Sequence, residues 1–257
     1  MAFSFFKKLC VTEAPTYQLP PGVRVYAIGD IHGQAQLLEN ALEAIAEDAK
    51  DFTGQRIIQV FLGDYIDRGM YSREVLDLLI QAPPVGHERI CLLGNHETTL
   101  LKFLETPETI RKWSSFGGFT TLASYGIPIP RTLSGEDLTE LHQTFAHALP
   151  ASHQAFLESL QTHYCLGEYF FVHAGINPYL SLDEQSVDDL LWIRDDFLEF
   201  EKFHQKYIIH GHTPVETLDI RKNRANLDLS IATGEQLGCL KLEGNQRINF
   251  TILMHND

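Results

Sequence analysis

Short apolar runs of β type alternate with helical segments in the first third of the chain, and this order constrains the fold more than any other feature. The apolar runs occupy residues 23–28, 56–62 and 89–93, and residues 34–50 and 72–80 carry apolar side chains at helical spacing. A helix between two such strands returns the chain to the same edge of the sheet, so the strands run parallel with helices packed on a sheet face. The sequence therefore predicts an α/β fold.

The remaining two thirds predict more helices and then further strands. Residues 98–162 are mostly helical in pattern, residues 164–172 read as a hairpin, and residues 183–203 are again helical. Further strands are expected at residues 207–209, 217–220, 226–229, 237–242 and 247–253. A fold with two packed, mixed sheets accommodates these strands better than one doubly wound sheet.

Length and composition favour one domain. The 257 residues, 44% of them hydrophobic, suffice for a single large core, and we expect residues 1–20 to be an N-terminal tail and residues 21–257 to be the domain. The scattered cysteines Cys10, Cys91, Cys165 and Cys239 predict neither a disulfide scaffold nor a zinc ribbon.

Net charge and hydropathy indicate which classes of binding partner the chain can have. Lys and Arg number 20 against 34 Asp and Glu, a net charge of -14, which argues against a nucleic-acid surface but not against a phosphorylated ligand bound by locally concentrated cations. No apolar run approaches the ~18 residues of a membrane span, and no secretory signal is recognisable. We expect a cytoplasmic protein with no nucleic-acid and no membrane partner.

Each early strand ends in a glycine followed by polar residues. The three segments are YAIGDIHG (26–33), VFLGDYIDRG (60–69) and CLLGNHE (91–97), and the later runs YFFVHAG (169–175) and YIIHGHT (207–213) repeat the pattern. The carboxyl ends of parallel strands meet at one edge of a sheet, where ligands bind, so these polar residues are predicted neighbours. The glycines are expected to permit a sharp exit from each strand.

Carboxylates, imidazoles and one amide oxygen make a mixed nitrogen and oxygen ligand set. Such a set suits Mn, Fe, Zn or Co rather than calcium, and it is too large for one tetrahedral ion. At this point the pair His210 and His212 remains undecided, because either histidine of HGH could face the site.

Each fragment alone also has a structural interpretation. Asp30 or Asp64 could cap a helix, His173 could be a core histidine, Asn95 a turn residue, and Glu97 could brace a loop or touch a substrate. The ordered occurrence of five such strand ends favours the metal site.

The motifs GDIHG, GDYIDRG, GNHE, HAG and HGHT, in this order, resemble those of the phosphoprotein phosphatases, and especially of their bacterial serine/threonine phosphatase branch. The resemblance runs from about residue 23 to residue 242. It implies a metallophosphoesterase-like four-layer α/β/β/α sandwich with two packed mixed β-sheets. Pro214, where broader relatives carry a last histidine, also points to this branch and makes His212 the ligand and His210 a packing residue.

The resemblance implies two divalent transition metal ions, Mn²⁺ in first place with Fe or Zn as alternatives. Asp30 and His32 would hold the first ion and Asp64 would bridge both. The second ion would be held by Asn95, His173 and His212.

The implied reaction is direct attack on phosphorus by a hydroxide that bridges the two metals. His96 would be the general acid, oriented and kept protonated by Asp67, and the phosphate would be bound by Arg68, Arg194, Asn95 and His96. For Arg194, in LLWIR, a surface salt bridge with Asp195 or Asp196 is the competing interpretation. One departure from the family pattern lies at 226–230, where NLDLS retains Asp228 but not its usual neighbours.

The resemblance makes a metal-dependent phosphomonoesterase acting on phosphoserine and phosphothreonine, or on phosphotyrosine, the first hypothesis, with a phosphorylated protein or peptide as partner. Hydrolysis of diadenosine tetraphosphate or another nucleotide is the alternative, against which GNHE in place of GNHD argues mildly. A catalytically silent phosphopeptide-binding module is the third hypothesis, opposed by the complete set of ligand, acid and arginine residues.

Overall fold

Three parallel strands form the centre of the first sheet. The computed structural model describes residues 16–130, 132–229 and 235–254, and in it β1 pairs with β2 and β2 with β3, all parallel, which confirms the predicted βαβαβ order. Two antiparallel strands from the end of the chain complete the order β11-β10-β1-β2-β3. The strands are β1 (Val23–Ile28), β2 (Arg56–Phe61), β3 (His87–Cys91), β10 (Cys239–Glu243) and β11 (Gln246–Asn249).

The second sheet has the order β4-β5-β6-β8-β7 and is also mixed. Strands β5, β6 and β8 are parallel to one another, while β4 and β7 are antiparallel to their neighbours. Its strands are β4 (His163–Leu166), β5 (Tyr169–Val172), β6 (Tyr207–His210), β7 (Asp219–Ile220) and β8 (Arg224–Asn226). A separate antiparallel pair joins β9 (Gln236–Leu237) to β12 (Ile252–Leu253).

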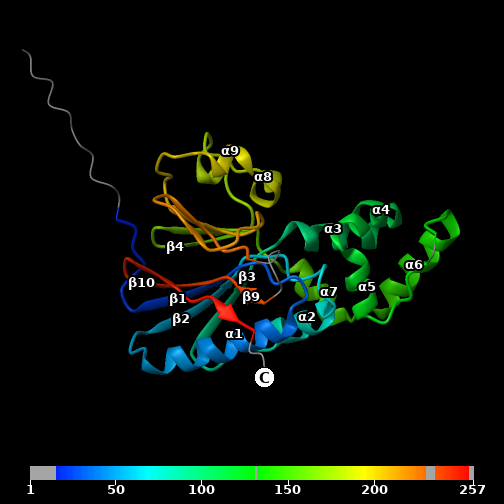
Figure 1. Ribbon diagram of the computed structural model, residues 1–257, viewed down its shortest axis with the longest axis horizontal. Coiled ribbons are helices and arrows are strands. Elements are labelled where there is room, and N and C mark those ends of the chain that lie inside the picture. Colours follow the sequence, from blue (N-terminus) through cyan, green and yellow to red (C-terminus); the bar gives the residue numbers. More distant parts are fainter. Residues whose placement is uncertain (1–15, 131, 230–234, 255–257) are drawn as a thin grey trace, which may run out of the picture.

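Helices cover the outer face of each sheet, and a further group of helices extends beyond the sheets. Helices α1 and α2 run along the first sheet, α8 and α9 cover the second, and α3 to α7 extend to one side (Figure 1). Their bounds are α1 (Ala35–Asp48), α2 (Ser72–Ile80), α3 (Asn95–Glu105), α4 (Ile110–Trp113), α5 (Gly118–Ser124), α6 (Gly135–Ala148), α7 (Ala151–Glu158), α8 (Val187–Trp192) and α9 (Asp195–Leu198).

Side-chain alternation along the strands produces the layers. On β1, Val25 and Ala27 point into the core between the sheets, while Tyr26 and Ile28 pack under the helices of the first sheet. On β5, Phe171 joins the same central core, and its neighbour Phe170 packs against the α8–α9 layer. Because both sheets are buried on both faces, the result is the predicted four-layer α/β/β/α sandwich.

Several predicted elements differ in the structure. The helical pattern at 183–203 is two short helices, because Ile193 has extended backbone and ends α8. The expected strand at 226–229 is wrong: β8 ends at Asn226, whose side-chain Oδ1 accepts the backbone N–H of Asp228 and turns the chain.

The two last predicted strands are each broken in two. Gly238 separates β9 from β10, and a Cβ there would collide with the carbonyl oxygen of Leu227. Between β11 and β12, the Asn249 side chain accepts hydrogen bonds from the backbone and hydroxyl of Thr251, which forms a turn.

The described part of the N-terminal segment packs on the domain. Tyr17 and Leu19 are buried in the core between the sheets, and the Leu19 N–H donates to the Gly244 carbonyl at 2.9 Å. The rest of the predicted tail, residues 1–15, lies outside the described residues. Among the helices that are described, none combines the length and apolar character that crossing a bilayer requires.

A partly buried cluster of ionic side chains joins α1 to the first sheet. Asp48, the last residue of α1, accepts hydrogen bonds from Arg24 (3.1 Å), the Tyr26 hydroxyl (2.5 Å) and Lys241 (2.8 and 3.1 Å). Burial alone would raise the pKa of Asp48, but the hydrogen bonds from Lys241 and Tyr26 outweigh it and lower the pKa below its usual value. The ionised carboxylate therefore stabilises the fold.

We expect Asp48→Asn to lower the free energy of unfolding by about 1.5 kcal/mol at pH 7, because a charged acceptor is lost. A lowered pKa contributes stability above the unfolded-state value of about 3.9, so the difference from wild type should shrink as pH falls below that value. Urea unfolding of metal-free protein at pH 7 and pH 3 measures this. Asp51→Asn, nearby and exposed, is the control, and an equal loss at both pH values would contradict the role of the charge.

Candidate metal centre

The carboxyl ends of five strands place the predicted site residues together. Asp30 and His32 follow β1, Asp64 and Asp67 follow β2, and Asn95 and His96 begin α3 after β3, all nearly inaccessible to solvent. The second sheet adds His173 after β5 and His212 after β6, which are also buried.

Asp64 lies at the middle of the cluster. Its Oδ2 is 3.6 Å from Nε2 of both His32 and His96, and its Oδ1 is 3.4 Å from Nε2 of His173. Two groups of donors share this carboxylate, His32–Asp64–His96 and Asp64–His173–His212, with ligand atoms within 4.8 Å of one another in each. The arrangement suits two cations with one shared carboxylate.

Backbone carbonyls fix which imidazole nitrogens face the centre. Nδ1 of His32 donates to the Ile66 carbonyl at 2.8 Å, and Nδ1 of His173 donates to the Leu62 carbonyl at 3.0 Å. Each Nε2 is then unprotonated, and its lone pair faces Asp64. Backbone carbonyls that accept the Nδ1 proton orient metal-binding histidines in the same way. Nε2 of His32 and of His212 are buried and have no hydrogen-bond partner among the described residues, so both fit a cation rather than a proton.

Electrostatics keeps these imidazoles neutral. Burial lowers the pKa of His32 to about 3 and that of His212 to about 2, and it also lowers the pKa of His173. Metal ligation requires the unprotonated form, so no proton has to be displaced at neutral pH. Asn95 completes this side, with Oδ1 2.9 Å from the Nε2 lone pair of His173, a contact of two acceptors that a cation would satisfy.

Asp30 lies beside the two donor groups, close to the backbone of the last motif. Both its oxygens accept the His212 backbone N–H at 3.2 Å. Burial, followed by the charges of Asp228 and Asp64, raises the pKa of Asp30 well above its usual value. Asp228, the residue retained in the divergent NLDLS segment, thus lies close enough to Asp30 to affect it, and such a group of carboxylates favours divalent cations.

Glycines allow the strand ends to approach one another. A Cβ at Gly211 would collide with Oδ1 of Asp30, and a Cβ at Gly94 would collide with Asp64. Gly63, with a φ of 101°, makes the sharp exit from β2 that the sequence predicted, while Gly94 and Gly211 serve this close approach.

Backbone strain is concentrated at the same place. Within the described ranges, all non-glycine residues with a positive φ belong to the site motifs. They are His32, Asp64, Asp67, Arg68 and His212. Such conformations cost about 1–3 kcal/mol each, and they persist where the surrounding structure enforces them.

The His96 ring is held differently from the other histidines. Its Nδ1 is 2.6 Å from Oδ2 of Asp67, a fully buried carboxylate that also accepts hydrogen bonds from Trp113 Nε1 (2.7 Å) and the Thr121 hydroxyl (2.5 Å). Burial lowers the pKa of His96, but Asp64 and Asp67 outweigh it and raise it to about 9. Sequence reasoning missed Trp113 and Thr121, which lie some 50 residues from Asp67 in a segment without a recognisable motif.

Glu97 braces the loop rather than facing the cluster. Its carboxylate accepts backbone N–H groups of Gly94, Asp64 and Tyr65 at 3.0, 2.9 and 2.8 Å. Of the two interpretations that the sequence left open, the structure shows the bracing one. These bonds hold Asp64 in its left-handed conformation.

Two exposed arginines lie at the edge of the centre. Arg68 is close enough to Asp30 for its charge to oppose the rise in the Asp30 pKa that burial causes. Arg194 is close enough to His212 for its charge to add to the lowering of the His212 pKa by burial and by His173. Neither guanidinium has a carboxylate partner among the described residues, so the salt bridge proposed for Arg194 is not formed there. Both remain available to an anion.

The two histidines of HGH are distinguished by their partners. Nδ1 of His210 lies 3.1 Å from the Gly211 carbonyl, and its Nε2 accepts Arg224 Nη1 at 3.3 Å. Both ring nitrogens of His210 are therefore occupied within the protein, whereas Nε2 of His212 is not.

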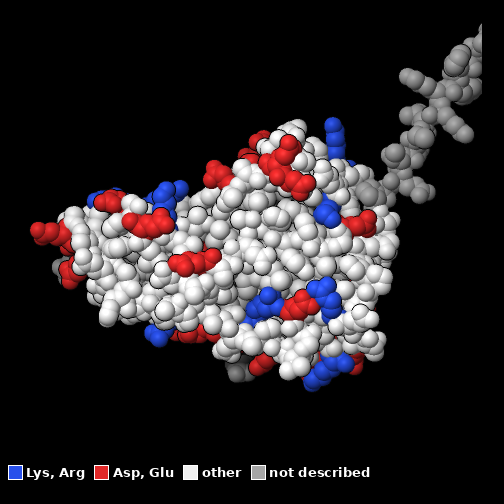
Figure 2. All heavy atoms as spheres, turned by 180° about the vertical axis from the view of Figure 1, so that it is seen from behind, with Lys and Arg blue, Asp and Glu red and all other residues white. Residues whose placement is uncertain are grey.

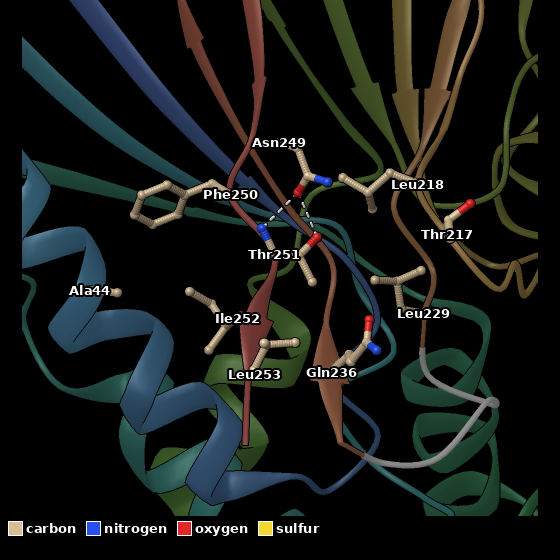
Figure 3. Close-up of a pocket in the computed structure, with 10 residues that line it drawn as sticks. All are labelled: Ala44, Thr217, Leu218, Leu229, Gln236, Asn249, Phe250, Thr251, Ile252 and Leu253. Atoms are coloured by element: carbon tan, nitrogen blue, oxygen red, sulfur yellow. Dashed lines mark hydrogen bonds between the residues drawn. The ribbon is translucent and has the colours of Figure 1, made fainter. Parts of the chain in front are cut away.

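A further cavity lies between α1 and the β9–β12 pair, with a volume of about 600 Å³ (Figure 3). Leu218, Leu229, Phe250 and Ile252 supply much of its wall. None of its lining residues is titratable, so it offers no acid, base or metal ligand, and the histidine cluster remains the candidate site.

We expect His212→Ala to weaken Mn²⁺ binding by at least roughly 100-fold, because it removes a ligand atom, while His210→Ala changes it only a few fold. Equilibrium dialysis with elemental analysis gives the metal affinity. His210→Ala removes a fully buried ring that packs on Phe197 and is one of several acceptors of Arg224, so it should instead lower the unfolding free energy by about 1–3 kcal/mol. Equal losses of metal affinity would refute this division.

Comparison with known proteins identifies the same architecture. The sequence profile of the calcineurin-like phosphoesterases matches residues 23–234. The chain is 27% identical to the asymmetrical bis(5'-nucleosyl)-tetraphosphatase of Oceanobacillus iheyensis over 236 residues, covering 84% of this chain and 87% of that protein. A symmetrical bis(5'-nucleosyl)-tetraphosphatase of Ectopseudomonas mendocina is 31% identical over 160 residues, 62% of this chain and 47% of the relative.

Other matches are shorter or show the fold alone. The serine/threonine-protein phosphatase 6 catalytic subunit of Drosophila melanogaster is 37% identical over 101 residues, 36% of this chain and 30% of that protein. A crystal structure assigned as a diadenosine tetraphosphatase superposes with a TM-score of 0.59 at 20% identity, covering 91% of this chain and 95% of the other. Because the family profile spans more than three quarters of the sequence and its fold is present, the chain belongs to the calcineurin-like phosphoesterase family.

Proposed function

We propose that this protein hydrolyses the phosphoanhydride chain of bis(5'-nucleosyl) tetraphosphates at a two-metal centre. The observation that carries the proposal is the similarity to a bis(5'-nucleosyl)-tetraphosphatase over most of both chains. This reverses the order of the sequence-based hypotheses, in which protein dephosphorylation came first.

Divalent cations are the proposed cofactors, held on one side by Asp30, His32 and Asp64 and on the other by Asp64, Asn95, His173 and His212. The mixed nitrogen and oxygen set suits Mn, Fe, Zn or Co, and Mn²⁺ is proposed first because of the family resemblance, with Fe or Zn as alternatives. Bound there, the cations would supply Lewis acidity that polarises the phosphoryl group and lowers the pKa of a water molecule.

Arg68 and Arg194 are proposed to bind the phosphoryl oxygens. Both are exposed and have no carboxylate partner among the described residues, and a guanidinium fork matches phosphate in two parallel hydrogen bonds. The amide of Asn95 could contribute a further hydrogen bond to the same oxygens.

His96 is proposed to deliver a proton from Nε2 to the leaving oxygen. Its Nδ1 is engaged by Asp67, so the ring is oriented with Nε2 toward the cluster, 3.6 Å from Asp64. A buried carboxylate at Nδ1 supports the protonated ring, whereas the proposed ligands His32 and His173 carry neutral carbonyls there. Asp67 acts by positioning and charge and does not touch the substrate.

The acidic surface is compatible with a small polyanion. Figure 2 shows acidic side chains gathered over the α8–α9 layer, which carries Asp188, Asp189, Asp195 and Asp196, while Lys and Arg form separate patches on this face. A long nucleic acid would meet repulsion from this acidic layer outside the centre, whereas a short phosphate chain bound at the centre would meet far less of it.

Protein dephosphorylation is the second candidate function. It is favoured by the 37% identity to the catalytic subunit of a serine/threonine-protein phosphatase. That match covers only 36% of this chain, so it supports a shared centre more than a shared substrate.

We expect Thr121→Val to lower kcat roughly tenfold for phenyl phosphate, whose phenolate is a poor enough leaving group to need the proton; this is a part of the ~10²–10⁴-fold that general acid–base catalysis contributes. The substitution keeps the shape but removes the hydroxyl that donates to Asp67. Thr120→Val is the matched control, since the neighbouring hydroxyl bonds only to the Gly117 carbonyl. Unchanged kcat in Thr121→Val, or a parallel loss of bound metal, would argue against a positioning role through His96.

The proposed substrate is tested with Mn²⁺-loaded protein on diadenosine tetraphosphate, a phosphoserine or phosphothreonine peptide, a phosphotyrosine peptide and p-nitrophenyl phosphate. We expect kcat/KM for the dinucleotide to exceed that for either peptide by at least about tenfold. Chromatography of the nucleotide products shows which anhydride bond is cleaved. A peptide preference would overturn the proposal in favour of the second candidate.

Asp64→Asn is the inactive control that measures background cleavage in these assays. It removes the carboxylate shared by both donor groups while keeping the side-chain size. Dinucleotide cleavage that persists in this variant would come from a contaminant or from another site.

A further inference from the structure

We infer that the pocket beside the metal centre is a second phosphate-binding subsite, in which Lys102 and Lys112 hold the distal phosphates of a nucleoside polyphosphate. The inference rests on the proposed function, because it concerns the part of that substrate remote from the bond cleaved. Residues Thr98, Thr99, Lys102, Lys112, Asp188 and Trp192 line the pocket.

The pocket has a volume of about 480 Å³, within the usual range for small-molecule sites. Two threonines at its wall, Thr98 and Thr99, belong to the first turn and a half of α3, the helix that begins with Asn95 and His96. One helix therefore carries proposed metal and acid residues at its start and the pocket wall immediately after them.

An aromatic pair connects the pocket to the centre. The Phe116 ring lies 5.8 Å from the His96 ring, the Trp192 ring lies 6.1 Å from the His212 ring, and the two aromatic rings are 6.1 Å apart. The pair therefore contacts a histidine of the centre at each end, and Trp192 also lines the pocket. A phosphate chain with one group at the cluster can thus continue along the aromatic pair into the pocket.

The same aromatic pair fixes the position of one lysine. Nζ of Lys112 lies 4.9 Å from the centroid of Trp192 and 5.6 Å from that of Phe116. Such cation–π contacts contribute modestly at exposed sites, but they restrict a flexible side chain to one region. The ammonium group of Lys112 is held over the wall that leads to the centre.

The pocket is cationic within an acidic protein. Lys102 and Lys112 face one acidic lining residue, Asp188, although the whole chain has a net charge of -14. Neither lysine has an ion-pair partner among the residues that the structure describes. The hydroxyls of Thr98 and Thr99 already donate to backbone carbonyls at the start of α3, so the two ammonium groups are the phosphate donors of this pocket, and a carboxylate such as Asp188 suits sugar hydroxyls.

The test compares the inhibition of p-nitrophenyl phosphate hydrolysis by inorganic tripolyphosphate and by orthophosphate, at fixed free Mn²⁺. Inhibition by orthophosphate measures binding at the metal cluster alone, whereas tripolyphosphate is long enough to bind at the cluster and in the pocket together. In the double variant Lys102→Gln/Lys112→Gln, the ratio of the tripolyphosphate Ki to the orthophosphate Ki should rise about tenfold, since two charge-assisted contacts are lost. The ratio cancels any change at the cluster itself.

The control is Lys50→Gln/Lys222→Gln, which removes the same charge elsewhere on the surface. Lys50 pairs with Glu47, and Lys222 lies over the Phe203 ring at 5.6 Å, an aromatic contact comparable to that of Lys112. This variant should keep the wild-type Ki ratio. If it raises the ratio as much as the pocket variant does, net charge explains the effect and the subsite is disproved.

A readout without metal or turnover is the tryptophan fluorescence of metal-free protein titrated with tripolyphosphate. The chain has two tryptophans, and Trp113 is fully buried, so a change reports the half-buried Trp192 at the pocket. Saturable change in wild type that is lost in Lys102→Gln/Lys112→Gln supports the subsite, and no difference between the two proteins refutes it.

The outcome is separable from that of the proposed function. The probes contain no nucleoside, so a raised Ki ratio establishes the subsite even if the substrate comparison favours a peptide. An unchanged ratio together with a raised KM for a phosphopeptide would overturn the inference and identify the pocket as a peptide groove.

Discussion

The structure depends on the burial of one carboxylate, Asp64, among neutral imidazoles. A buried charge requires strong compensation, and here two groups of potential metal ligands share the Asp64 carboxylate. The surrounding features serve this arrangement: the Glu97 carboxylate accepts the backbone N–H of Asp64, Gly94 allows the approach of α3, and left-handed backbone accompanies the buried side chains of His32, Asp64, Asp67 and His212. Because strain of this kind persists only where the fold enforces it, the central core between the sheets has a direct role in the site.

The cluster is built across the seam between the two sheets. His173 and His212 come from the second sheet, and Asp30, Asp64 and Asn95 come from the first, so neither sheet could form the centre alone. A backbone hydrogen bond also connects the two sheets, because the His212 N–H donates to the Asp30 carboxylate. Packing of the inner faces therefore sets the relative position of the two donor groups, which explains why so many residues between the sheets are fully buried.

The same centre serves phosphoesterases with different substrates, and the surroundings distinguish them. Around this centre the structure places exposed Arg68 and Arg194, an aromatic pair and a pocket with two lysines. The proposal of a polyphosphate substrate rests on these groups and on the long match to a bis(5'-nucleosyl)-tetraphosphatase. The helices α3 to α5 supply both the pocket wall and the hydrogen bonds from Trp113 and Thr121 to Asp67, so one segment carries the residues proposed for substrate binding and for proton delivery.

The sequence by itself determined the parallel strands of the first sheet, the second sheet and the identity of the polar residues at the strand ends, because hydrophobic periodicity and glycine-preceded motifs are local signals. It did not locate the breaks at Gly238 and Asn249 or the end of β8 at Asn226, since these follow from contacts with distant backbone and from side-chain turns. Only the tertiary structure decided that Trp113 and Thr121 hold Asp67, that Glu97 braces the loop, and that His210 is occupied while His212 is open. The physical reason is that hydrogen-bond partners separated by tens of residues leave no periodic pattern, and they become neighbours only when the two sheets pack.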